Sequence, residues 1–234
     1  MIRSVVKFTD DAAGLEKTLR LIQGFCTIAV GLAVSPADAD LWAKTRGQFA
    51  LGRRYFRLLK WYPCFVKASN AVSAERLSIS TILDTIKWTF LSLYFFLEMF
   101  TITNAMGITK FDWGPKVQHE ANKCWVYSLI ASILLSMVEL LWDNVRTADA
   151  SSVGKDEKKS RTETSSQEKQ PSTARSKLYI QLMIDSCDIL IPGSAVGWSP
   201  SALAVPLVVG VASTISTTLA GSQIWQRVQR EPRQ

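Results

Sequence analysis

Long apolar blocks separated by polar stretches set the pattern of this chain. A helix needs about 20 mostly apolar residues to cross a bilayer core of about 30 Å. The second block is long enough for one span, the fourth holds another at 203–226, and the third can hold one more at 125–142. The pattern therefore predicts an all-α, membrane-embedded protein with about two to three membrane spans. The four apolar blocks are residues 21–37, 88–109, 125–142 and 189–226.

The alternation of apolar and polar stretches divides the chain into five regions. Residues 1–87 are predicted to form an interfacial helical region, and residues 88–142 a hydrophobic helical hairpin. Residues 143–177 are rich in Ser, Thr, Lys, Glu and Gln, a composition that predicts a disordered polar linker. Residues 178–226 are predicted to form a short helix, a Pro/Gly turn and the last span, and residues 227–234 a basic tail.

The stretch RGQFALGRRYFRLLKWYP, residues 46–63, predicts the body of an amphipathic helix. Ser35 suits the N-cap, and Pro36 the first helical position, where its missing N–H costs nothing. Because Pro63 disfavours helical geometry at the residue before it, we expect the helix over 36–62. At about 100° per residue its side chains separate into two halves. The apolar half holds Phe49, Leu51, Tyr55, Phe56, Leu58 and Leu59, and the basic half holds Arg46, Arg53, Arg54, Arg57 and Lys60.

Three roles for this helix follow from the pattern. The formal net charge is +7, and six of the 27 basic residues fall between Lys44 and Lys60, with no acid between Leu41 and Lys67. A long apolar face opposite a cationic one favours a helix that lies in the interface of an anionic membrane. Alternatively, the apolar face packs on other helices and the arginines are solvated. A nucleic-acid contact is the least favoured of the three roles, because no nucleic-acid-binding motif accompanies the basic residues.

The remaining chemistry of the sequence is sparse. Glu98 and Glu139 are the only charges in their apolar blocks, so each is a candidate for a pore or a helix contact. The four cysteines form no metal-binding pair, and the single histidine, His119, does not share a helix face with Cys124. No glycine-rich phosphate loop or nucleophile elbow is present in the sequence. We therefore predict no enzyme, no catalytic residue, no metal and no cofactor. The N-terminal stretch lacks the apolar core of a secretory signal peptide.

Three segments carry a resemblance to a known family. They are ALGRRYFRLLKW at 50–61, ANKCWVYSLI at 121–130 and DSCDILIPGSAVGW at 185–198, ahead of a terminal span rich in small residues. In this order they resemble fungal members of the peroxisomal biogenesis factor 11 (peroxin 11) family. The resemblance implies an integral peroxisomal membrane protein with cytosolic termini that forms homo-oligomers. It also implies a dynamin-related fission GTPase and a fission adaptor as partners.

The resemblance and the residues together give two hypotheses for function. In the first, the helix at 36–62 inserts its apolar half into an anionic phospholipid membrane, its basic half contacts the headgroups, and the membrane elongates before peroxisome division. In the second, the protein is a pore for metabolites in the peroxisomal membrane and uses Glu98 and Glu139. Neutralising the arginines is expected to abolish elongation under the first hypothesis. Neutralising the carboxylates is expected to alter conductance under the second.

Overall fold

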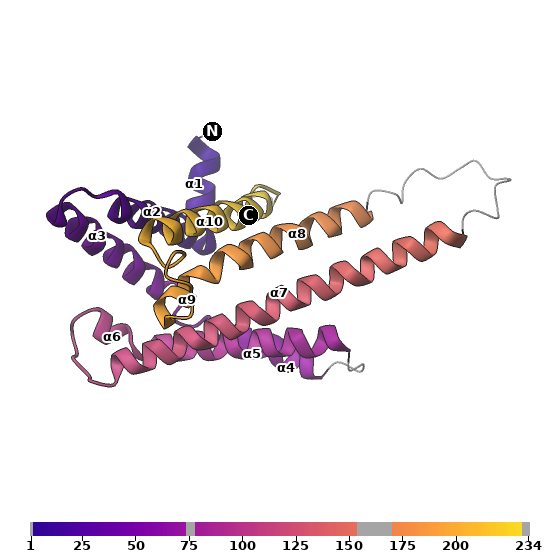
Figure 1. Cartoon of the computed structure of the whole chain (residues 1–234), viewed down its shortest axis with the longest axis horizontal. Coiled ribbons are helices and arrows are strands. Elements are labelled where there is room, and N and C mark those ends of the chain that lie inside the picture. Colours follow the sequence, from indigo (N-terminus) through magenta and orange to yellow (C-terminus); the bar gives the residue numbers. More distant parts are fainter. Residues whose placement is uncertain (1, 74–77, 154–169, 231–234) are drawn as a thin grey trace.

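Every regular element is a helix in the part of the chain that the computed structural model describes, which is residues 2–73, 78–153 and 170–230. This architecture confirms the predicted all-α class. The helices form two layers, and two further helices connect these layers (Figure 1).

The first layer brings the two ends of the chain together. It contains α1 (Ile2–Asp10), α2 (Ala12–Leu32), α3 (Pro36–Tyr55) and α10 (Pro206–Arg230). The N-terminal helix α1 packs on both α2 and α10, so both labelled ends of the chain lie on this layer (Figure 1).

The second layer consists of helices from the middle of the chain. It contains α4 (Trp61–Val72), α5 (Ile79–Phe100), α6 (Ile102–Ala105) and α7 (Gly114–Val153). Two further helices, α8 (Gln170–Asp188) and α9 (Leu190–Val196), contact both α7 and α10 and therefore connect the layers (Figure 1).

Local sequence signals explain where several helices begin. The Asp11 carboxylate accepts hydrogen bonds from the backbone N–H groups of Ala13 and Gly14, which fixes the start of α2. The Ser35 hydroxyl accepts from the N–H of Asp38 at the start of α3, as the sequence predicts.

A small hydroxyl also joins two neighbouring helices. Ser92 of α5 donates a hydrogen bond to the Trp61 carbonyl of α4 at 2.8 Å, a kind of contact that is common between membrane helices.

Glycine allows α2 and α10 to pack with their backbones close together. A Cβ added to Gly31 of α2 would lie 2.7 Å from the backbone nitrogen of Leu207. A Cβ added to Gly210 of α10 would lie 2.8 Å from the backbone nitrogen of Ile28. Any larger side chain at either position would therefore push the two helices apart. The small-residue character of the last span thus fits its contact with α2.

The amphipathic helix is shorter than the 36–62 expected from the sequence. It ends at Tyr55, and α4 begins at Trp61 after a turn. In this turn the N–H of Lys60 donates to the carbonyl of Arg57 at 3.0 Å, a tight three-residue spacing. Pro63 lies in the first turn of α4, and it has no N–H to donate to the carbonyl four residues earlier. The proline therefore interrupts the helix upstream of itself, rather than only at Tyr62.

Two helices of the described residues are long and apolar enough to cross a membrane, by length and composition. They are the Gly114–Val145 part of α7 and the whole of α10, Pro206–Arg230. The block 88–109, expected as one span, is not a single helix, because α5 ends at Phe100 and the short α6 follows. The third block and the last block therefore supply the two candidate spans.

The polar linker expected at 143–177 is partly helical. Helix α7 continues to Val153, and α8 begins at Gln170. No proline or glycine interrupts the end of α7, so a helix nucleated in the apolar block can extend into the polar residues. The centre of the predicted linker, residues 154–169, lies outside the described residues, as do residues 231–234 of the predicted basic tail.

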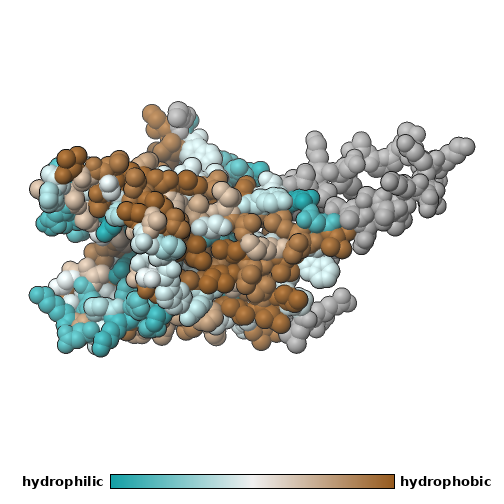
Figure 2. All heavy atoms as spheres, in the orientation of Figure 1, coloured by the Kyte–Doolittle hydropathy of each residue, from teal (hydrophilic) through white to brown (hydrophobic). Residues whose placement is uncertain are grey.

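Many large apolar side chains lie on the outside of this protein, and several charged ones are buried between its helices. Figure 2 shows large hydrophobic areas on the visible face, whereas hydrophilic residues gather around α6. The exposed large apolar residues include Leu141 at 63% and Met183 at 55%. This distribution suits a helix bundle surrounded by lipid. The charged residues buried between the helices are Glu16, Arg20, Arg53, Glu98, Asp185 and Asp188.

Candidate functional site: an arginine cluster between the helix layers

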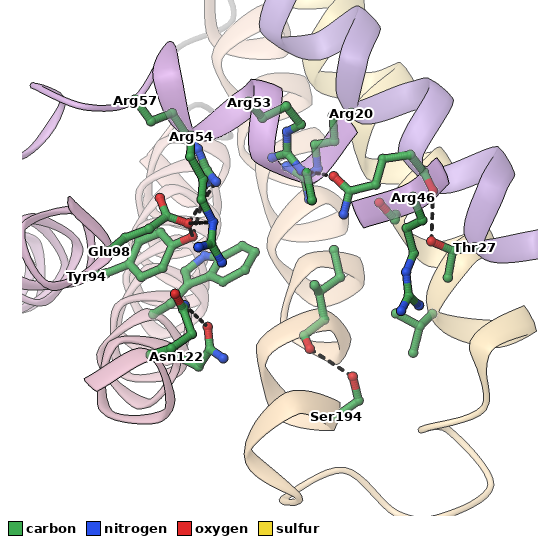
Figure 3. Close-up of a pocket in the computed structure, with 17 residues that line it drawn as sticks. Arg20, Thr27, Arg46, Arg53, Arg54, Arg57, Tyr94, Glu98, Asn122 and Ser194 are labelled. Atoms are coloured by element: carbon green, nitrogen blue, oxygen red, sulfur yellow. Dashed lines mark hydrogen bonds and ion pairs between the residues drawn. The ribbon is translucent and has the colours of Figure 1, made fainter. Parts of the chain in front are cut away.

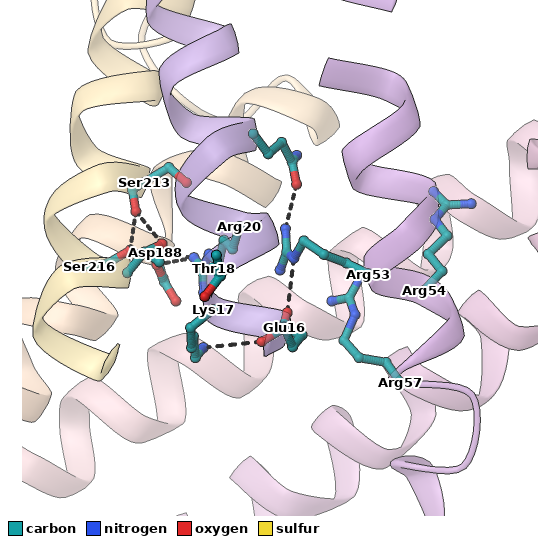
Figure 4. Close-up of polar contacts among 12 residues, drawn as sticks. Glu16, Lys17, Thr18, Arg20, Arg53, Arg54, Arg57, Asp188, Ser213 and Ser216 are labelled. Carbon is teal, nitrogen blue, oxygen red and sulfur yellow. Dashed lines mark hydrogen bonds and ion pairs between the residues drawn. The ribbon is translucent and has the colours of Figure 1, made fainter. Parts of the chain in front are cut away.

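Arg53 turns from α3 toward α2 and is held there by two side chains. Its Nε donates to Glu16 Oε1 at 2.9 Å, and its Nη1 donates to Gln23 Oε1 at 2.6 Å (Figure 4). The Arg53 and Glu16 side chains are only 10% and 4% exposed. Both groups of the ion pair are therefore removed from solvent, so loss of either would leave an uncompensated buried charge.

Arg54 and Arg57 meet a single carboxylate of the other layer. Arg57 lies in the turn after α3, and its Nη2 lies 2.9 Å from Glu98 Oε1 on α5. The same Glu98 oxygen lies 3.6 Å from Arg54 Nε and accepts a hydrogen bond from the Tyr94 hydroxyl at 3.0 Å. Glu98 is 5% exposed. These contacts hold the end of α3 against α5, so this carboxylate joins the two layers.

A third buried ion pair joins α2 to α8. The guanidinium of Arg20 donates to the carboxylate of Asp188, and its Nη2 also donates to Ser216 Oγ of α10 at 3.4 Å (Figure 4). One turn earlier on α8, Asp185 accepts from the Ser132 hydroxyl of α7 at 2.6 Å. Arg20 and Asp188 therefore bring α2, α8 and α10 together at the centre of the protein.

The electrostatic environment of this centre is strongly cationic. Burial raises the pKa of Glu16, but Lys17 and Arg53 outweigh it and hold that pKa well below its usual range. Burial and the nearby Arg20 lower the pKa of Lys17 to about 8. Burial and the nearby Arg57 lower the pKa of Arg53 to about 10. The Glu16 carboxylate thus stays ionised readily, whereas burial and neighbouring guanidinium groups disfavour the charged forms of Lys17 and Arg53.

Two cavities lined by several charged side chains meet at this cluster. One, of about 300 Å³, opens between α3, α5, α7 and α9, and the other, of about 440 Å³, opens between α2, α5, α7 and α8. Figure 3 shows Arg54, Arg57, Tyr94 and Glu98 on one side of the smaller cavity, and Arg20 and Arg46 on the other. The residues that line both cavities are Arg20, Arg53, Arg57, Tyr94 and Trp125.

The two halves of the predicted amphipathic helix lie in different environments. All five basic residues line one or both cavities: Arg46, Arg53, Arg54, Arg57 and Lys60. Of the predicted inserting residues, Phe49 and Leu51 are half-buried. The other four are exposed and form, with Tyr62, what we call the outer patch: Tyr55 at 49%, Phe56 at 40%, Leu58 at 40%, Leu59 at 68% and Tyr62 at 59%.

The two carboxylates predicted as pore or helix-contact residues have different surroundings. Glu98 forms the helix contact described above and lines the smaller cavity. Glu139 is half-buried on α7 and lines neither of the two cavities. The structure therefore gives the two glutamates separate environments rather than a shared one.

Sequence reasoning missed the partners of the arginines. Glu16 and Arg20 belong to the predicted helical region 1–87, and Asp185 and Asp188 to the segment DSCD. A signal was present, because Glu16 and Arg20 are four residues apart and share one face of a helix with many apolar residues, and the two aspartates are spaced to lie on one face of α8. Charged residues at helical spacing within mostly apolar helices therefore mark the buried side of this bundle.

Comparison with known proteins gives consistent matches. The family model described as peroxisomal biogenesis factor 11 (PEX11) matches residues 2–225. Peroxisomal membrane protein PMP27 of Saccharomyces cerevisiae is 26% identical over 148 residues. The matched segment covers 61% of this chain and 61% of the yeast protein. No solved structure matches the chain.

Proposed function

Because this chain belongs to the peroxisomal biogenesis factor 11 family, we propose that it elongates the peroxisomal membrane by inserting the outer patch into the cytosolic leaflet. Family membership makes it a peroxisomal membrane protein. We further propose that elongation promotes peroxisome proliferation and division.

The outer patch is the observation that carries the proposal. It groups two tyrosines, a phenylalanine and two leucines at the end of α3, in the turn after it and at the start of α4, all at least 40% exposed. Apolar side chains on the side of a helix bundle insert into the headgroup and acyl boundary, with a free energy that grows with the apolar area buried. A segment inserted into one leaflet adds area to that leaflet alone, so it favours a curved membrane.

We call the outer patch, once inserted into the leaflet, the wedge. The ion pairs behind it can make it rigid. Arg53 is fixed to α2 through Glu16, and Arg57 is fixed to α5 through Glu98. When these two ion pairs are formed, the outer patch lies on a rigid part of the bundle, and the basic side chains point into the protein. We propose that the headgroup contacts predicted for Arg53, Arg54 and Arg57 require α3 to separate from the carboxylates of α2 and α5. The headgroup contacts predicted for Arg46 and Lys60 do not require this separation, because neither forms an ion pair among the described residues.

The test compares two double variants of the full chain, reconstituted into vesicles that contain anionic phospholipid. Leu58→Gln/Leu59→Gln removes apolar area from the outer patch, and we expect it to abolish tubules in electron micrographs. Val72→Gln/Ile108→Gln is the matched control, because these residues are 64% and 68% exposed but lie outside the patch. Normal tubules from the patch variant, at equal incorporation and helix content, would rule the wedge out.

The partners and topology follow the same proposal. Crossing of the membrane by α7 and α10 alone leaves both chain ends on one side, which agrees with cytosolic termini. Protease protection of tags at the two ends tests this topology.

We also propose that the protein forms homo-oligomers on anionic phospholipid membranes and works with a dynamin-related fission GTPase and a fission adaptor. Cross-linking in intact peroxisomes tests these contacts.

A pore is the second candidate function, and the two cavities favour it. They meet at Arg20, Arg53 and Arg57, and opening of the ion pairs would join them into a polar passage. Such a pore would prefer anions because most charges that line it are positive. Planar bilayer recordings test it: Glu98→Gln is expected to change conductance, whereas Glu139→Gln, outside both cavities, is expected not to.

A further inference from the structure

The smaller cavity carries more positive charge than its own partners neutralise. Five guanidinium groups and one carboxylate, Glu98, are present among its lining residues. A buried charge is costly unless an opposite charge or several hydrogen bonds compensate it. The arginines are Arg20, Arg46, Arg53, Arg54 and Arg57.

Pairing within the described residues leaves this surplus in place. Arg20 has Asp188 and Arg53 has Glu16, but Glu16 is shared with Lys17 at 3.7 Å. Glu98 serves both Arg54 and Arg57, and Arg46 has no ion pair or hydrogen bond among the residues that the structure describes. Over both cavities the cations outnumber the anions. The anions are Glu16, Glu98, Asp185 and Asp188, and the cations are Lys17, Arg20, Arg46, Arg53, Arg54, Arg57, Lys60 and Lys87.

Two buried donors in the cavity lining also lack an acceptor. The Nε–H groups of Arg20 and Arg57 have no hydrogen-bond partner in the described structure. The side chains are only 6% and 10% exposed, so bulk water is largely excluded from them. An unmet buried donor adds to the cost of holding these guanidinium groups, and an anion in the cavity would offset their positive charge.

Neutral polar groups complete the lining. Asn122 of α7 lies on the same side of the cavity as Arg54 and Glu98, and Ser194 of α9 lies at another wall (Figure 3). Gln118 of α7 also lines the cavity. Guanidinium groups bind phosphate oxygens through paired, charge-assisted hydrogen bonds, and amide or hydroxyl donors add further contacts. A volume of about 300 Å³ accommodates a phosphate group with a small substituent.

We propose that this cavity binds a phosphate-class oxyanion, with Arg46 as the arginine that is free to hold it and Arg20, Arg54 and Arg57 as the surrounding charges. The anion has two possible sources with the same chemistry: a soluble phosphate or the headgroup of a phospholipid. The site lies on the opposite side of α3 from the outer patch, so it goes beyond the proposed wedge. Its occupancy does not depend on membrane elongation.

The experiment uses the full chain in micelles of a neutral detergent, where no elongation occurs. Inorganic phosphate is titrated against the melting temperature, with sodium chloride at matched ionic strength as the reference, and short-chain phosphatidic acid is the lipid arm. We expect a saturable rise in melting temperature with one or both phosphate probes and none with chloride. A response to phosphatidic acid alone identifies the lipid headgroup as the source, and a response to inorganic phosphate identifies the soluble one.

Two variants on α3 locate the site. Arg46→Gln is expected to weaken binding by about tenfold or more while leaving the ligand-free melting temperature unchanged, since Arg46 makes no ion pair among the described residues. Arg46→Lys should retain part of the affinity. Lys44→Gln is the matched control, because this side chain is 74% exposed and outside the cavity, and it should bind like the wild type. No saturable response to either probe, or equal binding by Arg46→Gln and the wild type, would overturn the proposal.

Discussion

The two sides of the chain around residues 53–62 have opposite surroundings. On the inner side, Arg53 is 8% exposed and bonded to Glu16, whereas on the outer side Leu59 is 68% exposed. In a soluble protein the apolar side of such a helix would be buried and the basic side solvated. Here the order is reversed, because the cations find carboxylates inside the bundle and lipid can surround the apolar side chains. An amphipathic pattern therefore defines two faces without defining which one is buried.

The buried ion pairs of the inner side, which we call the inner face, are expected to contribute most to the free energy of unfolding. Glu98→Gln should have the largest effect. The substitution leaves Arg54 and Arg57 buried without their carboxylate, and loss of one partner of a buried pair costs about 3–5 kcal/mol. Denaturant unfolding in detergent measures this loss. Glu120→Gln is the control, since Glu120 is 59% exposed in its pair with Lys123 and should change stability by less than about 1 kcal/mol. Equal effects of the two would mean that Glu98 is not a buried link.

A charge swap tests what the inner arginines do. Arg53→Glu alone places two carboxylates together and should be strongly destabilising. Adding Glu16→Arg reverses the pair, and we expect it to recover about 0.5–3 kcal/mol of the loss. Tubule formation by the double variant is the second measurement, alongside its stability. Recovered tubules mean that Arg53 anchors the wedge, whereas stable protein without tubules means that Arg53 contacts headgroups.

Acid should weaken the inner face progressively. The pKa of Glu16 is held below its usual range in the folded protein, so the unfolded chain takes up a proton first as the pH falls. The stability from this pair is therefore present above about pH 4.5 and declines as the pH falls below that value. Melting temperatures between pH 6 and pH 3 measure the effect. Glu16→Gln should show a smaller decline over this range, and a decline equal to that of the wild type would contradict the assignment.

The outer patch should contribute least to stability. Leu59→Gln replaces a side chain that is 68% exposed, so we expect the free energy of unfolding in detergent to change by no more than about 0.5 kcal/mol. The same variant should form fewer tubules after reconstitution into vesicles that contain anionic phospholipid. Gln48→Ala, at an exposed polar position of α3, provides the control for both measurements. A loss of stability well above that limit would show that Leu59 packs inside the protein.

The sequence contains enough information for the helices but not for their contacts. The Ser35 cap, the helix beginning after Asp11 and the last span are predictable because capping residues and apolar periodicity act within one or two turns. The Arg53–Glu16 and Arg20–Asp188 pairs are not, because they join residues that are 37 and 168 positions apart. Basic residues on one helix face fit headgroups and internal carboxylates equally well, so only the tertiary arrangement separates these partners.

The close packing of α2 against α10 constrains how the protein is made. Gly31 and Gly210 bring the two backbones together, yet their helices lie near opposite ends of the chain. During synthesis α2 leaves the ribosome long before α10 does, so α3, which also packs on α2, is the partner that reaches it first. The first layer is therefore completed in two steps, with α10 added to an α2–α3 pair that is already in place.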